Sequence, residues 1–260
     1  MLAHVNILGI NIQTFGVFFA LNFVAWGAVA ARRLKELGKP PDWAFEIVVC
    51  AVIGGLIGAR AYWLIQNHGQ LEGSLLGNVF GGSGLVWYGG FLGGTIAVLL
   101  WARWRGFFSL QLVDIAAYGL ALGYAIGRIG CQVSGDGDYG KPWNGPWAMG
   151  YPHGTVPTPP GVTVHPTPIY ETLAMGFVAW VLWHWRDRFR PGVLFAMYLV
   201  AAGIERFLVE FLRRNDRVVA GLTVPQLESL GLLIAGSIAL LVVYRRGGLA
   251  RRDQLALAAN

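Results

Sequence analysis

Seven long apolar stretches constrain the possible folds of this chain more than any other feature of its sequence. They cover residues 12–31, 43–66, 84–104, 109–130, 168–185, 192–213 and 224–244. As helices that rise ~1.5 Å per residue, stretches of about 18–24 residues cross the roughly 30 Å hydrocarbon core of a bilayer. Only 13% of the residues are charged, about half the share of a soluble domain. The sequence therefore predicts an all-α membrane protein, a single domain over residues 1–260 with seven transmembrane helices.

The lysines and arginines of the loops predict how these helices are oriented. Many of them follow the first, third, fifth or seventh stretch: Arg32, Arg33, Lys35, Lys39, Arg103, Arg105, Arg186, Arg188, Arg190, Arg245, Arg246, Arg251 and Arg252. Basic loops remain on the cytoplasmic side of a membrane. The N-terminus is therefore expected outside and the C-terminus in the cytoplasm. Because topology explains the net charge of +6, the basic composition does not indicate a nucleic-acid partner.

The outer segment 131–167 is too long and too rich in glycine and proline to be a simple turn. It holds seven glycines and seven prolines, and proline excludes a long helix. Its aromatic residues Tyr139, Trp143, Trp147 and Tyr151 suit the level of the lipid headgroups. We expect a small irregular cap on the outer face, inserted between the fourth and fifth helices. The alternative is a disordered loop.

Two of the apolar stretches contain glycine runs, "GGLIGAR" (54–60) and "YGGFLGG" (88–94). Small residues spaced in this way let helix backbones approach each other closely. The alternative is a kinked or opened helix beside a headgroup site, which glycine also permits. The runs therefore predict either close helix packing or local opening near lipid.

Three arginines lie within the outer halves of the second, fourth and sixth predicted helices: Arg60, Arg128 and Arg206. An arginine at membrane depth costs roughly 2.5–3.5 kcal/mol on insertion scales, so it usually faces the protein interior and has a function. For Arg128 the alternative is a side chain that extends to the interface. Three cations at comparable depth indicate an anion site, and a lipid phosphate fits because the planar guanidinium binds two phosphate oxygens.

Carboxylates accompany these arginines in the sequence. Arg206, Glu210 and Arg213 have the spacing of one helix face. Arginine before glutamate is the weaker order for stabilising an isolated helix, which favours a shared site over a helix-stabilising pair. We expect Glu210 and Asp136 to act as partial counter-ions of the anion site.

Six segments occur in an order that is known from one family. They are "NIQTFGVFFALNF" (11–23), "GGLIGARAYWLI" (54–65), "GLVWYGGFLGG" (84–94), "GRIGCQVSGDGDYG" (127–140), "HPTPIYE" (165–171) and "RFLVEFLR" (206–213). In these segments the chain resembles the prolipoprotein diacylglyceryl transferases, membrane enzymes that lipidate bacterial lipoprotein precursors. The resemblance extends over nearly the whole chain.

The resemblance implies a reaction in the bacterial cytoplasmic membrane. The diacylglyceryl group of phosphatidylglycerol passes to the lipobox cysteine of a prolipoprotein signal peptide, which forms a thioether and releases glycerol phosphate. Arg128 and Arg206 would neutralise the phosphate, Glu210 would orient Arg206 or join proton transfer, and Tyr88 would donate a hydrogen bond. The implied substrate-binding residues are Arg60, Gly89, Gly90, Asp136, Gly140, Tyr170, Glu171 and Arg213. Neither a cofactor nor a metal is implied.

Several polar positions depart from the family pattern. Tyr88 stands in place of the usual histidine, Phe15 of a tyrosine, Cys131 of an asparagine and Asp136 of a glutamate. A tyrosine with a reference pKa of about 10 is a poor general base. The proton acceptor therefore stays open, and so do two alternative functions. These are a family paralogue with a different acceptor, and a lipid-binding or transport protein without enzymatic activity.

Overall fold

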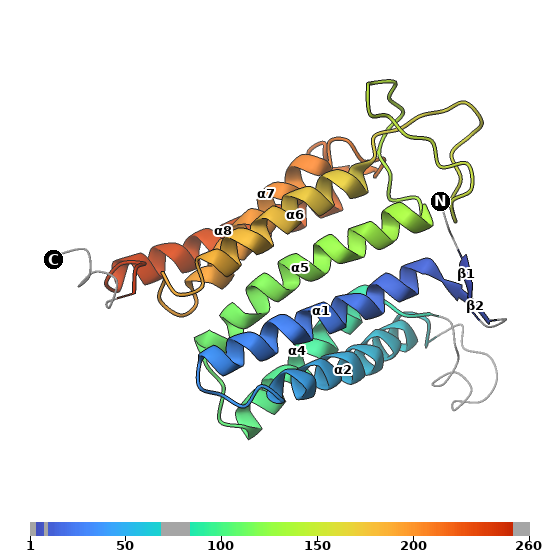
Figure 1. Cartoon of the computed structure of the whole chain (residues 1–260). Helices are drawn as coiled ribbons and strands as arrows, with labels where there is room; N and C mark the ends of the chain where they lie inside the picture. Colours follow the sequence, from blue (N-terminus) through green and yellow to red (C-terminus); the bar gives the residue numbers. More distant parts are fainter. Residues whose placement is uncertain (1–3, 8–9, 69–83, 252–260) are drawn as a thin grey trace. The chain divides into compact units, whose positions relative to one another are not determined.

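The computed structural model describes residues 4–7, 10–68 and 84–251 (Figure 1). Within these residues, each predicted apolar stretch forms a helix, so the all-helical prediction is confirmed. The helices are α1 (Thr14–Glu36), α2 (Trp43–Gln66), α4 (Trp87–Trp104), α5 (Leu110–Ser134), α6 (Thr167–His184), α7 (Val193–Val209) and α8 (Val224–Arg245). Helix α7 ends at Val209, four residues before the expected end, so Arg213 lies beyond the helix.

Four helices of the described part are long and apolar enough to cross a membrane: α1, α2, α5 and α8. In α5, half of the most apolar window is buried inside the protein, compared with 11% in the other three. Helices α1, α2 and α8 therefore leave most of their apolar surface outward, as expected for helices that contact lipid.

The chain forms two compact units, and each is described by itself. The first unit contains the described residues up to Trp26 and those from Val113 onward. The second unit is the continuous segment Gly27–Leu112, so helix α1 contributes to both.

The second unit is built around a close crossing of α2 and α4. A Cβ atom on Gly54 would lie 2.6 Å from the carbonyl oxygen of Gly93, and one on Gly58 would lie 2.8 Å from the Gly93 Cα. These distances are shorter than any relaxed contact, so the crossing requires glycine. The packing interpretation of the two glycine runs is therefore confirmed.

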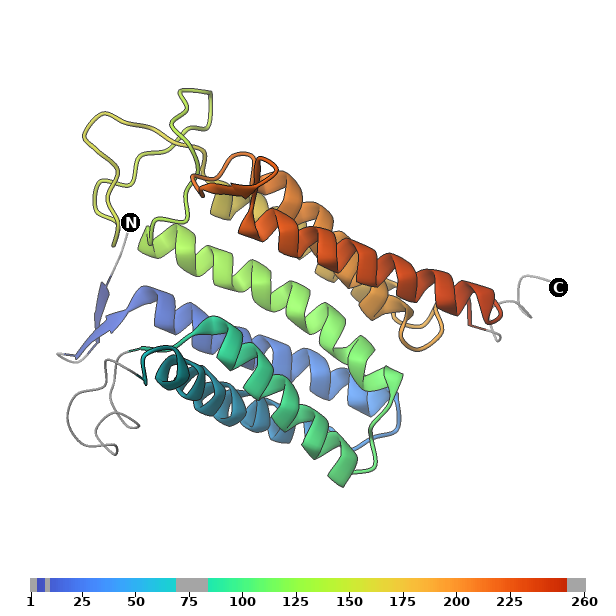
Figure 2. The ribbon, with the colours of Figure 1, turned by 180° about the vertical axis from the view of Figure 1, so that it is seen from behind.

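In the first unit, α6, α7 and α8 lie side by side in both views (Figures 1 and 2). Gly236 of α8 permits the contact with α7, because a Cβ atom there would lie 2.8 Å from the Ala196 carbonyl oxygen. The buried Asp114 of α5 accepts hydrogen bonds from the backbone N–H groups of Gly192 (2.8 Å) and Phe195 (3.0 Å). Asp114 thus satisfies the start of α7, where backbone donors have no helical partner.

The connection between α5 and α6, residues 135–166, is irregular but has a small core of its own. Tyr139, Tyr151 and Val164 are almost fully buried there, and the two tyrosine rings stack at 4.7 Å. Tyr151 donates a hydrogen bond to Gln132 Oε1 (2.8 Å), and Met149 pairs with Val164 through their backbones. The segment is therefore an ordered element rather than a disordered loop.

The sequence predicts neither of the two hairpins in the structure. Strands β1 (His4–Ile7) and β2 (Ile10–Gln13) pair antiparallel just before α1. Strands β3 (Arg217–Val219) and β4 (Leu222–Thr223) form a second hairpin that leads into α8. Thr223 begins α8 with a capping box, in which its hydroxyl accepts from Gln226 N–H and its own N–H donates to Gln226 Oε1.

Candidate active site

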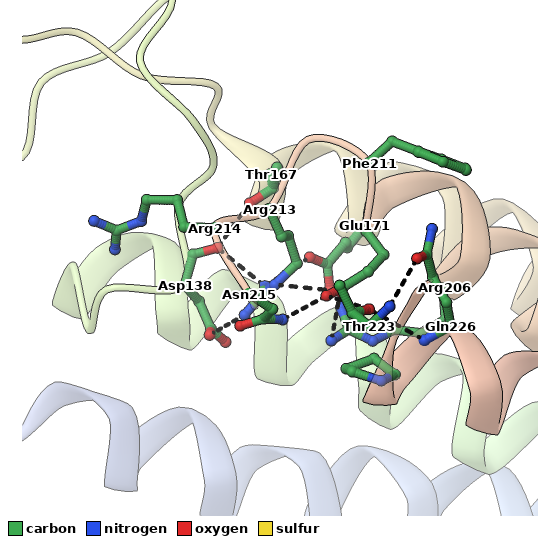
Figure 3. Close-up of polar contacts among 12 residues, drawn as sticks. Asp138, Thr167, Glu171, Arg206, Phe211, Arg213, Arg214, Asn215, Thr223 and Gln226 are labelled. Atoms are coloured by element: carbon green, nitrogen blue, oxygen red, sulfur yellow. Dashed lines mark hydrogen bonds and ion pairs between the residues drawn. The ribbon is translucent and has the colours of Figure 1, made fainter. Parts of the chain in front are cut away.

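Two arginines and two acids form a closed ring of ion pairs in the first unit. Arg128 of α5 contacts the fully buried Glu171 of α6 through Nε and Oε2 (2.5 Å). Arg213, in the turn after α7, contacts Glu171 Oε1 (3.2 Å). Asp138 of the irregular segment closes the ring, because each of its carboxylate oxygens pairs with one of the two arginines. We call these four residues the quartet; Figure 3 shows Asp138, Glu171 and Arg213 directed toward one another.

Neutral groups complete the bonding of the quartet. Tyr124, one turn before Arg128 on α5, donates to Glu171 Oε2 (2.6 Å) and accepts from Arg128 Nη2 (3.2 Å). Thr167 donates its hydroxyl to the backbone oxygen of Asp138 (2.7 Å). Buried charges persist only where they are paired and hydrogen-bonded, and the quartet meets both conditions.

The electrostatics of the quartet keep Asp138 ionised. Burial by itself would raise the pKa of its carboxyl, but the nearby Arg128 and Arg213 lower it by more. The pKa of Asp138 therefore lies below its ordinary value, and the group is an anion at neutral pH. The quartet then carries two positive and two negative charges.

A second cluster lies around Arg206 and Glu210, beside the quartet. Arg206 Nη2 lies 3.0 Å from Glu210 Oε2 as an ion pair without hydrogen-bond geometry. The other oxygen of Glu210, whose side chain is fully buried, accepts from Asn215 Nδ2 (2.6 Å) and from the Thr223 hydroxyl (3.0 Å). Arg213 Nε lies 3.9 Å from Glu210 Oε2 and so connects the two clusters.

Arg206 differs from the quartet arginines in its bonding. Among the residues that the structure describes, its buried Nη1 atom has no hydrogen-bond partner. Arg128, in contrast, uses Nε, Nη1 and Nη2 on Glu171, Asp138 and Tyr124. A buried donor without a protein partner is usually bonded to a water molecule or a ligand.

A polar hollow of about 390 Å³ opens beside the quartet. Its lining is Gly137, Asp138, Tyr139, Arg213, Arg214 and Asn215. Arg214 lies over the Tyr139 ring (4.3 Å) and donates to the Gly137 carbonyl oxygen (2.9 Å). With two arginines and one acid in its lining, the hollow suits a small polar anion better than an acyl chain.

The structure corrects the expected counter-ion in the irregular segment. Asp136 accepts a hydrogen bond from the backbone N–H of Asp138 (3.2 Å). The carboxylate that contacts Arg128 and Arg213 is instead that of Asp138. The physical reason is local: the loop turns at Gly135 and Gly137, both with positive φ, and this turn directs Asp138 inward.

Gly140 and Tyr170 occupy supporting positions around the quartet. Gly140 donates its N–H to the His165 carbonyl oxygen (2.8 Å), and a Cβ atom there would lie 2.6 Å from the Leu212 carbonyl oxygen. The Tyr170 hydroxyl accepts from Trp147 Nε1 (2.7 Å) at the surface of the irregular segment. Tyr170 therefore connects this segment to α6, and Gly140 lets the segment approach the turn after α7 closely.

The remaining predicted residues belong to the second unit. Arg60 donates to the Gly84 carbonyl oxygen (3.1 Å) and lies over the Trp63 ring (4.5 Å). Tyr88 lies in the first turn of α4 and is about half exposed, and Gly89 belongs to the glycine crossing with α2. Gly90 has only an ordinary contact, because its Cβ atom would lie 3.5 Å from Gly55. That Arg60 lies at the same membrane depth as Arg128 and Arg206 stays a prediction, since Arg60 is in the other unit.

Cys131 lies next to the quartet, with its Sγ 3.6 Å from Asp138 Oδ2 and 3.8 Å from Arg128 Nη1. Both Cys131 and Cys50 are free thiols. Potential metal-ligand atoms of Cys131, Asp136 and Asp138 lie within 4.8 Å of one another. Both Asp138 oxygens are already bonded to arginines, whereas Asp136 Oδ1 accepts the backbone N–H of Asp138.

Five polar residues of the two clusters were not predicted as site residues: Tyr124, Asp138, Thr167, Asn215 and Thr223. Tyr124 lies four residues before Arg128, and helical spacing alone is enough to place both side chains on one face. No sequence signal distinguishes Asp138 from Asp136, because the fold of the loop decides which of them faces the arginines.

Long apolar helices and an interior of paired arginines and carboxylates define a helical membrane protein with a buried, charged site. The family model described as prolipoprotein diacylglyceryl transferase matches residues 3–243. The chain therefore belongs to the prolipoprotein diacylglyceryl transferase family, as its six segments predict.

Curated relatives agree with this family. A phosphatidylglycerol--prolipoprotein diacylglyceryl transferase of Finegoldia magna is 33% identical over 247 residues, 93% of this chain and 94% of the relative. A Clostridium tetani protein of the same name is 30% identical over 235 residues, 89% of this chain and 93% of the relative. A third, from Leptospira interrogans, is 32% identical over 233 residues, 79% of this chain and 73% of the relative.

Proposed function

We propose that this protein transfers the diacylglyceryl group of phosphatidylglycerol to the lipobox cysteine thiol of prolipoprotein signal peptides. Membership of the family and the names of the relatives support this activity. The structural observation that carries the proposal is the buried Arg206 Nη1 donor, which has no hydrogen-bond partner among the described residues. A phosphate oxygen is a natural acceptor for such a donor.

We further propose that all seven helices cross the bacterial cytoplasmic membrane. The N-terminus then lies outside and the C-terminus inside, and the irregular segment forms a cap, residues 131–167, on the outer face. The distribution of basic residues and the four long apolar helices support this placement. In this orientation the quartet lies at the outer end of α5, at the level of the lipid headgroups.

The reaction needs fixed positive charge where the phosphate becomes a leaving group. The thiolate attacks the glyceryl carbon, the bond from that carbon to the phosphate oxygen breaks, and glycerol phosphate leaves with the electron pair. Preorganised cations stabilise charge that develops in this way. Arg206 supplies the available donor, and Arg128 adds positive potential while its own donors hold Glu171 and Asp138.

Glu210 fits the role of a positioning residue for Arg206. One of its oxygens faces Arg206, and the other is held by Asn215 and Thr223 at the start of α8. This bonding fixes the arginine relative to two elements of the first unit. Of the two roles that the sequence leaves open for Glu210, orientation of Arg206 is therefore favoured over proton transfer.

The polar hollow provides a path for the water-soluble product. Its arginines Arg213 and Arg214 attract the phosphate of glycerol phosphate, and its polar walls exclude acyl chains. We propose that Arg60, Tyr88, Gly89 and Gly90 of the second unit contact the lipid substrate, with the Tyr88 hydroxyl as a hydrogen-bond donor. Asp136, Gly140, Tyr170 and Glu171 hold the surroundings of the phosphate.

Expression in bacterial cells depleted of their own transferase tests this function. The precursor of a major lipoprotein should shift to the mobility of the lipidated form, and mass spectrometry should show the added diacylglyceryl group. If the precursor stays unmodified although the protein is in the membrane, the proposed activity fails. Loss of phosphatidylglycerol without a modified precursor would instead indicate a paralogue with another acceptor, and unchanged lipid and precursor would indicate a lipid-binding protein.

A further inference from the structure

Glu205 is a partly buried acid that the proposed mechanism does not use. It lies on α7 immediately before Arg206. Its Oε1 atom is buried and has no hydrogen-bond partner among the described residues. The other acids of the site differ, because Glu171, Asp138 and Glu210 each form ion pairs with arginines. A buried carboxylate oxygen without a partner is rare in proteins and calls for a functional explanation.

The groups around Glu205 come from several elements of the first unit. Electrostatic interactions reach its carboxylate from Arg128 of α5, Glu171 of α6, and Arg206 and Arg213 at the end of α7. The Tyr124 and Tyr198 hydroxyls are also within electrostatic range of it. Glu205 therefore faces the same charged interior as the quartet.

The balance of charges in this interior distinguishes Glu205 from the other acids. The three arginines Arg128, Arg206 and Arg213 carry three positive charges, and Glu171, Asp138 and Glu210 balance them in direct ion pairs. Glu205 is a fourth acid in this interior, and no arginine or lysine of the described residues forms an ion pair with it. It is therefore the carboxylate that can accept a proton without breaking an ion pair.

We propose that Glu205 is the proton acceptor for the substrate thiol, an inference that rests on the proposed transferase function. The thiol proton passes to the Glu205 carboxylate, which becomes a neutral carboxylic acid. The thiolate electron pair then forms the carbon–sulfur bond as the carbon–oxygen bond to phosphate breaks. The proton finally moves from Glu205 to the glycerol phosphate that leaves, so that the carboxylate is regenerated and all atoms balance.

With Glu205 as the base, the reaction does not need a histidine before the Gly-Gly pair at positions 89 and 90. Tyr88 stands at that position and is a poor base at neutral pH. A thiol with a reference pKa of about 8.5 is mostly protonated at neutral pH, so a base is needed. General base catalysis typically contributes about 10²–10⁴ in rate.

Turnover of purified wild-type protein, Glu205→Gln and Glu205→Ala on a lipobox peptide, from pH 5.5 to 10, tests this inference. We expect each variant to lose about 100-fold or more of kcat/KM at pH 7 and to lose the ascending limb of the wild-type pH profile. Glu228→Gln, at an exposed position on α8, is the matched control and should keep the wild-type profile. Because Glu205→Gln keeps the size of the side chain and Oε1 has no hydrogen bond among the described residues, this variant should keep the wild-type thermal midpoint in detergent.

Alkaline rescue distinguishes a base from a structural residue. Above about pH 9 the peptide thiol ionises without help, so the rate of both variants should rise toward the wild-type rate. A rate within threefold of wild type at pH 7, or a deficit that persists unchanged to pH 10, would overturn the role of Glu205. Absence of turnover in the wild-type protein would instead overturn the transferase function on which the inference rests.

Discussion

The two units accommodate polar side chains within apolar helices in different ways. In the second unit, Arg60 bonds a backbone carbonyl oxygen and stacks on Trp63, and the helices meet through glycines. In the first unit, three arginines bond carboxylates from α6, the irregular segment and the end of α7. Glycine crossings need no charge to be stable, whereas a charged interior is expensive in a membrane. The difference indicates that the first unit carries the chemistry and that close packing dominates the second.

Removal of Arg206 should have the largest effect. We expect Arg206→Ala to lower lipid transfer by about 100- to 1,000-fold, because it deletes a fixed donor for the developing phosphate charge. Arg217→Ala, on the exposed strand β3, is the control and should keep nearly full activity. Equal losses in the two variants, measured as transfer per molecule of membrane-inserted protein, would contradict the distinction between buried and exposed arginines.

The second-largest effect is expected from removal of Asp138, the acid that bonds both arginines of the quartet. Asp138→Asn leaves Arg128 and Arg213 without a common counter-ion, and we expect about 2 kcal/mol of destabilisation and a tenfold loss of activity. Because the folded-state pKa of Asp138 is depressed, its stabilising effect is present above the unfolded value of about 4. That effect disappears as the pH falls through the lower folded-state pKa.

Thermal midpoints measured in detergent between pH 7 and pH 3 check this pH dependence. Wild-type protein should lose stability in the acid range, and the Asp138→Asn variant should lose less of it. Asp136→Asn is the matched control, since Asp136 accepts a backbone N–H and the ion pairs of the two arginines are with other acids. Parallel curves for wild type and Asp138→Asn would show that the ion pairs of Asp138 do not stabilise the fold.

The glycine crossing makes a third prediction, now for the second unit. Gly58→Ala should lower the thermal midpoint in detergent, by about 1–3 kcal/mol of overpacking, because its Cβ atom meets the Gly93 backbone. Gly55→Ala is the control on the same helix, with its nearest atom at 3.5 Å. The crossing would not depend on glycine if both variants melted at the wild-type temperature.

Tyr88→Phe should have a smaller effect. Loss of one hydrogen bond to the lipid headgroup corresponds to about 1 kcal/mol, or a roughly fivefold decrease in kcat/KM. The ascending limb of the pH profile should persist, since Tyr88 is not the base. If Tyr88→Phe loses the ascending limb of the pH profile, the proton acceptor is Tyr88 rather than Glu205.

The smallest effect is expected at Arg214. Its side chain lines the hollow and bonds Gly137 and the Tyr139 ring rather than Arg206 or Glu210, so Arg214→Ala should lower turnover about threefold at most. Inhibition by added glycerol phosphate should weaken at the same time, because one of two cations in the hollow is gone. Unchanged inhibition would separate the hollow from product release.

Hydropathy is enough to predict the seven helices, since the length and apolarity of a spanning helix follow from the bilayer. Spacing also predicts that Arg206, Glu210 and Arg213 approach one another, although the helix ends before Arg213. The pairing of Asp138 is beyond prediction because left-handed turns at Gly135 and Gly137 decide it. The charge of Glu205 is visible in the sequence, but only the three-dimensional structure shows that its Oε1 atom has no hydrogen-bond partner among the residues described.

The central claim is that the arginine cluster around Arg206 receives the phosphate of phosphatidylglycerol. The most direct measurement follows glycerol phosphate release and thioether formation together, with purified protein, phosphatidylglycerol vesicles and a lipobox peptide. We predict one glycerol phosphate for each thioether in the wild-type protein and neither product in Arg206→Ala. Release at the wild-type rate by Arg206→Ala, or thioether formation without glycerol phosphate, would contradict the claim.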